Sequence, residues 1–241
     1  MAAGGNLLVI SVTRLGDGIC VACVDEKGKW VRPTREGSDG WRQLKLGSLR
    51  DDRGQIVIKP GNLVQWPLGR PAPREVHSED VLVSSAHPRL VRALTQREAV
   101  TKCEQLCEET LVGFLRGNDR SLMMLRPRSI EQIVFSIRGK GGVSARIRFG
   151  HEGGQENLSV TDLAWRAMGR GLLESSRAQE LSWTRSDLLR HMGLTIRYLA
   201  IGRGQPWGDG PPHPLAGRFW PVVTTVFTDP PVSAAVDYAN L

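Results

Sequence analysis

Two stretches of the chain combine cationic side chains with a geometry suited to nucleic acid. The first is a tryptophan flanked by cations: Trp30 with Lys29, Arg32 and Arg35, and Arg14 upstream. An indole ring can stack on an unpaired base while neighbouring cations neutralise the phosphates of a single strand. This stretch therefore predicts a contact with single-stranded nucleic acid. The alternative is that Trp30 is a half-buried strand aromatic and that the cations only hydrate the surface.

The second stretch is a predicted hairpin with a cationic outer face. Apolar residues alternate along 133–137 and again along 143–149, with the glycine-rich segment 139–142 between them. This period of two predicts paired strands with one face toward a core. The opposite face then carries Arg146 and Arg148, with Arg138 and Lys140 near the turn. Such a face can follow a phosphate backbone; the alternative is a solvated surface, because no aromatic residue stands among these cations.

A third candidate is the loop 202–212, which is rich in glycine and proline and carries Arg203 and Trp207. Its prolines disfavour a following helix, so its glycines do not form a dinucleotide-binding turn. The loop could close over a strand of nucleic acid, or it could be a surface loop that binds nothing.

A different class of function is an enzyme or nucleotide sensor that uses a cleft between two barrels. His77, Asp80 and Asp162, with Arg203, would line that cleft. Catalysis is the less favoured reading, because no serine or cysteine lies in a recognisable nucleophile elbow and no second histidine has metal-ligand spacing. A third reading is a protein adaptor within a larger nucleoprotein complex.

The four cysteines do not predict a metal site. Cys20 and Cys23 lie in a strand-like run, where residues three apart point to opposite faces. Cys103 and Cys107 share the apolar face of a predicted helix, where free cysteines behave as small hydrophobes. We therefore expect no metal and no cofactor.

Composition favours a basic globular protein. The 241 residues allow two small β domains, and the formal charge is +7 with arginine far more frequent than lysine. The guanidinium fork matches phosphate, so this excess favours nucleic acid as the partner. No apolar run approaches the roughly 20 residues that span a bilayer, and the N-terminus lacks the basic region of a secretory signal. We expect no membrane contact and a cytoplasmic location.

Short strands separated by turns dominate the pattern. They are predicted at 6–13, 19–24, 29–32, 55–58, 62–66, 194–202 and 218–227, besides the cationic hairpin. Thr95 and Glu98 form a capping box that starts a helix, and Asp162 can cap another. No regular alternation of strands and helices is present. The pattern predicts a mainly β fold with a few helices.

Several short motifs resemble the dual OB-containing domain family of prokaryotic proteins, which carry two oligonucleotide/oligosaccharide-binding (OB) folds in tandem. They are SVTR at 11–14, ICVACVD at 19–25, KWVRP at 29–33, HSED at 77–80, VTDL at 160–163, RYLAIG at 197–202 and FWPVV at 219–223. The resemblance implies two OB-like β-barrels joined through a helical segment. The first barrel with a packing helix would occupy 1–120, and the second, with a C-terminal tail, 121–241. It also implies a non-catalytic module that binds single-stranded DNA or RNA in a nucleic-acid-processing or defence system.

Overall fold

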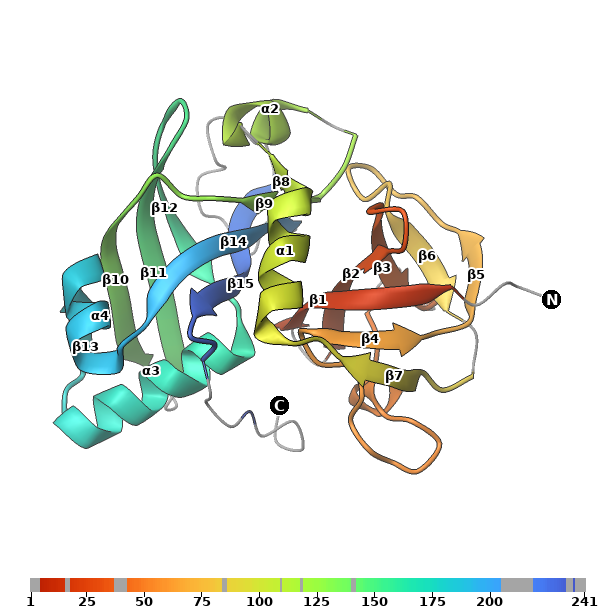
Figure 1. Cartoon of the computed structure of the whole chain (residues 1–241), viewed down its shortest axis with the longest axis horizontal. Coiled ribbons are helices and arrows are strands. Elements are labelled where there is room, and N and C mark those ends of the chain that lie inside the picture. The colour runs from red at the N-terminus through yellow and green to blue at the C-terminus, as the bar shows by residue number, and fades with distance from the viewer. Residues whose placement is uncertain are drawn as a thin grey trace. The chain divides into compact units, whose positions relative to one another are not determined.

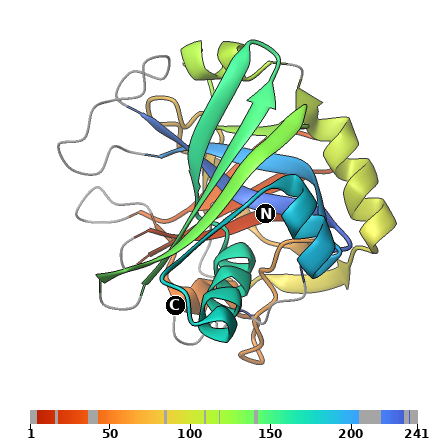
Figure 2. The ribbon, with the colours of Figure 1, turned by 90° about the vertical axis from the view of Figure 1, so that its left-hand side faces the viewer.

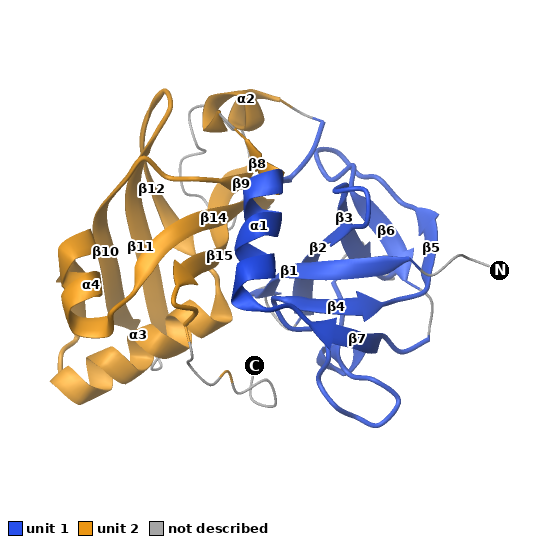
Figure 3. Cartoon of the chain, viewed as in Figure 1, with its two compact units in different colours: residues 1–105, 118–122, 237–241 blue, residues 106–117, 123–236 orange. Residues whose placement is uncertain are grey.

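The structure is a computed structural model that describes residues 5–15, 18–36, 43–83, 86–108, 110–117, 119–139, 142–204, 219–232 and 236. Within these ranges the chain forms two β-sheets and four α-helices (Figure 1). It divides into two compact units (Figure 3). Unit 1 comprises residues 1–105, 118–122 and 237–241, and unit 2 comprises residues 106–117 and 123–236. The predicted mainly β class is confirmed.

Unit 1 is built on a curled sheet of seven strands in the order β5-β6-β3-β2-β1-β4-β7 (Figure 1). The strands are β1 (Asn6–Leu15), β2 (Gly18–Asp25), β3 (Trp30–Thr34), β4 (Asn62–Gln65), β5 (Leu68–Pro71), β6 (Asp80–Val83) and β7 (Arg89–Ala93). Neighbours run antiparallel, except that β3 pairs with β6 in parallel.

The predicted hairpin of β2 and β3 is present. The Asp25 carboxylate accepts the backbone N–H groups of Lys27 and Lys29, each at 2.9 Å, and so closes the turn. Gly28 has a φ of 80°, a backbone conformation that glycine adopts without strain. Pairing with β2 ends at Val31, and β3 continues beyond it by pairing with β6. This change of partner brings residues 32–34 beside residues 80–82.

The segment after β3 differs from the expected loop and strand. It contains the short 3-10 helix η1 (Leu46–Leu49), and Leu44 bridges Ile19 and is fully buried. The strand predicted at 55–58 is wrong, since only Ile56 makes an isolated bridge there, to Arg50. Buried leucines and the isolated bridge between Leu44 and Ile19 hold this segment to unit 1.

Unit 2 contains the second sheet, whose eight strands follow the order β13-β10-β11-β12-β15-β14-β9-β8. They are β8 (Cys107–Glu108), β9 (Leu122–Leu125), β10 (Ser129–Arg138), β11 (Gly142–His151), β12 (Gly154–Val160), β13 (Glu180–Trp183), β14 (Thr195–Gly204) and β15 (Trp220–Asp229). The helices of the chain are α1 (Gln96–Leu106), α2 (Leu111–Arg116), α3 (Leu163–Ser176) and α4 (Arg185–Met192). Strands β10, β11 and β12 lie toward the viewer in Figure 2.

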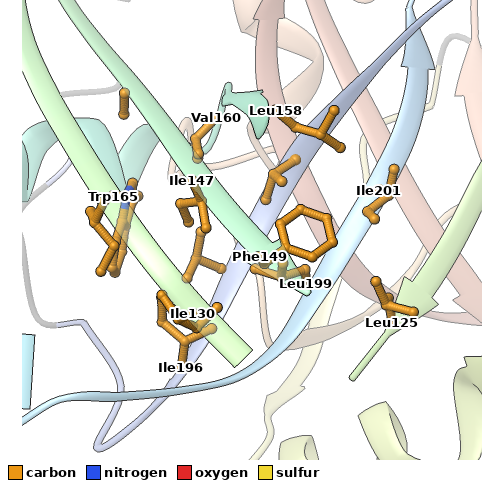
Figure 4. Packing of buried hydrophobic residues seen from close by; sticks show 14 of the residues in the cluster. Leu125, Ile130, Ile147, Phe149, Leu158, Val160, Trp165, Ile196, Leu199 and Ile201 are labelled. Carbon is orange, nitrogen blue, oxygen red and sulfur yellow. The ribbon is translucent and has the colours of Figure 1, made fainter. Parts of the chain in front are cut away.

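The core of unit 2 lies between its curved sheet and α3. Side chains from β10, β11, β12 and β14 point toward one another (Figure 4). The rings of Phe135 and Trp165 have centroids 5.6 Å apart, and neither residue is exposed. Gly169 lets α3 approach β10 this closely, because a Cβ atom there would lie 2.2 Å from the Phe135 ring. The buried face of the hairpin is therefore fixed by aromatic packing.

Helix α1 begins with the capping box predicted for it. The Thr95 hydroxyl accepts the backbone N–H of Glu98, and the Glu98 carboxylate accepts the backbone N–H of Thr95. The prediction that Cys107 shares this helix is wrong, because α1 ends at Leu106 and Cys107 lies in β8. The longest described helix is α3, with 14 residues, and the structure describes no helix long and apolar enough to cross a membrane.

The capping box gives the first testable prediction. Arg92 donates two hydrogen bonds to Glu98, at 2.7 and 2.9 Å, and holds the pKa of Glu98 at about 2 together with the bonds from Thr95. Because the folded-state pKa is lowered, the carboxylate stabilises the fold above the unfolded-state pKa, and this contribution is lost as the pH falls from 4.5 toward 2. We expect Arg92→Gln to raise the pKa of Glu98 toward 4.5, measured by NMR titration of its side-chain carboxyl carbon. Arg97→Gln, on the same helix, is the control, and an equal shift in both variants would contradict the prediction.

Candidate nucleic-acid interface

The outer face of unit 2 is set by the register of its central hairpin. Ile133 lies opposite Ile147 and Phe135 opposite Ala145, and all four are at most 1% exposed. The alternate positions therefore point away from the core. They define the outer face of β10, β11 and β12: Gln132, Val134, Ser136, Arg138, Ser144, Arg146, Arg148, Asn157 and Ser159.

Arg146 occupies the middle of the outer face and has a fixed orientation. Its Nε donates to Oδ1 of Asn157 at 3.1 Å, its Nη1 to Oγ of Ser159 at 3.0 Å, and its Nη2 to the backbone carbonyl of Asn157 at 2.5 Å. These partners lie on β12, which pairs with β11. Burial lowers the pKa of Arg146, and the charge of Arg138 lowers it further. The guanidinium is thus held in place by neutral groups, and no carboxylate of the described residues is among its hydrogen-bond partners.

Two further predicted cations of the outer face are exposed. Arg148 lies opposite Gln132 and Asn157, and Arg138 lies at the end of β10. In the described part of the chain neither guanidinium makes a hydrogen bond or an ion pair. Both can therefore meet an anion from solvent. Lys140, predicted at the same turn, lies outside the described residues.

One cation of this region was not predicted from the sequence. Arg166, in the first turns of α3, donates from its Nε to the carbonyl of Val160 at 2.7 Å. Burial lowers its pKa, the charge of Arg138 lowers it further, and Asp162 opposes these effects. The sequence places Arg166 in the helix that Asp162 is predicted to cap, and no local pattern joins it to the hairpin.

The predicted cluster around Trp30 in unit 1 is only partly exposed. Trp30 lies opposite the buried Val24 on β2 and is half-buried. Lys29 and Arg14 are exposed, and Arg35 is half-buried. Because Trp30 is half-buried, the strand aromatic remains an alternative to the stacking platform.

Arg32, the fifth member of that cluster, is half-buried and forms an ion pair with Asp80. Its Nε and Nη2 donate to the two carboxylate oxygens of Asp80 at 2.5 and 2.9 Å, and the side chain of Asp80 is 2% exposed. Burial would lower the pKa of Arg32, but the hydrogen bond and charge of Asp80 outweigh it and raise the pKa. Cys20 lies nearby with a pKa raised by burial. The fork of Arg32 therefore serves Asp80, and a contact of Arg32 with phosphate stays a prediction.

The residues predicted for a cleft are buried within their own units. In unit 1, His77 and Asp80 are 5% and 2% exposed, and the neighbouring Glu79 accepts the backbone N–H and the hydroxyl of Ser121 at 2.7 and 3.0 Å. In unit 2, Asp162 accepts the backbone N–H groups of Trp165 at 3.0 Å and Val226 at 2.8 Å. The predicted role of Asp162 as a helix cap is present; a shared cleft for these residues stays a prediction.

Arg203 lies inside unit 2 and is 3% exposed. Its guanidinium carbon is 4.8 Å from the centre of the Phe114 ring, and its Nη1 donates to the carbonyl of Gly117 at 2.5 Å. These contacts hold β14 to the end of α2. Trp207 lies outside the described residues. Among the residues that the structure describes, no group of three or more histidine, cysteine, aspartate or glutamate side chains could hold a metal ion.

Comparisons with known proteins identify a family. The model of a family described as dual OB-containing domain matches residues 6–181. No curated protein matches the chain. A solved structure described as the crystal structure of the tetrameric p202 HIN2 aligns over 92% of this chain and 89% of its own, at 8% sequence identity and a TM-score of 0.26.

Proposed function

Because the chain belongs to the dual OB-containing domain family, we propose that it is a non-catalytic protein that binds single-stranded nucleic acid, DNA or RNA. The family match and the mainly β structure confirm the predicted fold class of two OB-like β-barrels in tandem. The observation that carries the proposed function is the outer face of unit 2, where Arg138 and Arg148 are exposed beside the oriented Arg146. We propose further that the protein acts as a module of a nucleic-acid-processing or defence system.

The outer face suits a phosphate backbone for a physical reason. Its arginines project from adjacent strands of one sheet, so they form a track rather than a single point of charge. Arginine binds phosphate through two parallel N–H···O bonds, which adds geometry to charge. Trp30 in unit 1 would add a base-stacking contact, worth roughly 1–3 kcal/mol per stacked base, and Lys29 beside it a phosphate contact. The outer face would thus supply affinity for the phosphate backbone, and Trp30 would supply a preference for unpaired bases.

The proposal is tested by fluorescence anisotropy with labelled single-stranded DNA, single-stranded RNA and duplex of equal length. If about four phosphates are contacted, the logarithm of the affinity for a single strand should fall with the logarithm of salt concentration at a slope of about −3 between about 50 and 200 mM. We expect Trp30→Ala to weaken binding of single strands more than binding of the duplex, because only unpaired bases can stack on the ring.

The control for this experiment is Trp183→Ala, which removes a half-buried tryptophan of unit 2 that stacks on His191. It should leave the preference for single strands unchanged. Absence of binding to all three polymers at the lowest salt concentration would contradict the proposed function. Equal loss of single-strand and duplex binding in Trp30→Ala would contradict the stacking role of Trp30 while leaving the outer face in place.

A further inference from the structure

Two guanidinium groups of unit 2 are held on neighbouring residues of one strand. Arg146, from β11, donates to the hydroxyl of Ser159, and Arg166, from α3, donates to the carbonyl of Val160. These contacts, at 3.0 and 2.7 Å, place one nitrogen of each guanidinium against adjacent residues at the end of β12. Elements separated in the chain thus converge on one place.

A third cation, Arg138, acts on both groups. Its charge lowers the pKa of Arg146 and of Arg166, in each case in addition to the effect of burial. None of the three makes an ion pair in the described ranges. Asp162 is the carboxylate that acts on Arg166, but its oxygens accept the N–H groups of Trp165 and Val226. Glu180, which pairs across β10 with Ser136, forms no ion pair with them either.

Like charges that crowd without a counterion repel one another, and a bound anion removes that cost. The donors are also available. A guanidinium has five N–H groups, of which Arg146 uses three for Asn157 and Ser159 and Arg166 uses one for Val160. Arg138 makes no hydrogen bond among the described residues and is exposed. The remaining N–H groups come from three side chains, which suits an anion with several oxygen atoms.

We infer that Arg138, Arg146 and Arg166 form a phosphate-binding site, here called the arginine triad. Its ligand is a phosphate group, because planar guanidinium forks match tetrahedral phosphate oxygens and several donors can share one group. The phosphate could belong to a nucleic-acid strand, in which case the inference rests on the proposed function. It could equally be free phosphate, which does not depend on that function. Arg146 is the oriented member and Arg138 the accessible one.

The first arm of the test uses inorganic phosphate as the probe. Phosphate should raise the melting temperature of the whole chain above that in sodium chloride of equal ionic strength, because a ligand that binds only the folded state stabilises it. Arg138→Gln and Arg166→Gln should each lose this increase. In chloride alone, Arg138→Gln should melt no lower than the unchanged chain, since the substitution removes a repelling charge and breaks no hydrogen bond of the described structure. A purely structural arginine would give the opposite result.

The second arm uses a labelled oligonucleotide, and the control for both arms is Arg170→Gln. Arg170 is an exposed arginine of α3 outside the triad, so its removal changes the net charge equally. We expect Arg138→Gln and Arg166→Gln to weaken oligonucleotide binding about tenfold, the loss typical of a charge-assisted hydrogen bond, and Arg170→Gln to weaken it far less.

The outcomes separate the inference from the proposed function. If the triad variants lose both the phosphate-dependent stabilisation and oligonucleotide affinity, the triad is supported with nucleic acid as a source of its phosphate. If they lose the phosphate-dependent stabilisation and the unchanged chain binds no oligonucleotide, free phosphate is supported and the proposed function is contradicted. If the triad variants match Arg170→Gln in both arms while remaining folded, the triad is not a phosphate site. Oligonucleotide binding would in that case leave the proposed function intact.

Discussion

Replacement of Arg32 by alanine is expected to destabilise the folded chain by about 3–5 kcal/mol. The substitution would leave the Asp80 carboxylate, whose side chain is 2% exposed, without the guanidinium that occupies both of its oxygens. A buried charge that loses its partner keeps the cost of its dehydration and loses the compensating attraction. Chemical denaturation of the two proteins at neutral pH measures the difference.

The chain offers a matched control for this result. Arg70 and Glu36 also form an ion pair, at 2.6 Å, but their side chains are 73% and 68% exposed. Arg70→Ala should therefore cost no more than about 1 kcal/mol. If Arg32→Ala cost as little as Arg70→Ala, the Asp80 carboxylate would have found water or another partner. The ion pair would then no longer favour a structural role for Arg32 over a ligand-binding role.

The central hairpin of unit 2 could be predicted from the sequence because its residues alternate. A period of two assigns each side chain to a face before the partner strand is known. Of the residues expected in the core, Phe135 and Ile147 are unexposed, whereas Ile137, next to the turn, is 39% exposed. The outward direction of Arg146 and Arg148 follows from the same pattern. Cationic positions on a strongly alternating strand are therefore the part of a site that sequence reasoning reaches.

Strands with little apolar alternation along their sequence could not be predicted. Every residue of β7 is exposed, and most of β12 is polar. These segments are extended because they pair with β4 and with β11. Strand formation of this kind depends on long-range partners, which local propensity does not report.

The same limit applies to the partners of the cations. Arg32 and Asp80 are 48 positions apart and meet because β3 and β6 pair in parallel at that register. Arg166 joins the region of Arg146 because α3 turns back at the end of β12. Residue type thus predicts that an arginine can bind phosphate, but the fold decides whether its fork faces a carboxylate or solvent.

Asp162→Ala is the second substitution expected to have a large effect, a loss of about 3 kcal/mol in the free energy of unfolding. The buried carboxylate caps α3 through the N–H of Trp165 and also accepts the N–H of Val226 on β15. Loss of a helix cap costs about 1 kcal/mol, and a buried N–H left without an acceptor costs about 1–3 kcal/mol more. Burial raises the pKa of Asp162 against these hydrogen bonds, which indicates how far the group is removed from water.

Thr184→Ala is the control for Asp162→Ala, because Thr184 caps α4 at an exposed position. Its replacement should lower the free energy of unfolding by only about 1 kcal/mol. Asp162→Asn separates the two hydrogen bonds, since an amide offers one acceptor oxygen where two donors need one each. We expect the free energy of unfolding of Asp162→Asn, measured by urea denaturation, to lie between that of Asp162→Ala and that of the unchanged chain. If Asp162 instead served a ligand in a cleft, both variants would keep their stability and change binding alone. The paired backbone donors of Trp165 and Val226 favour the opposite result, in which stability falls and the affinity of the folded fraction for nucleic acid is retained.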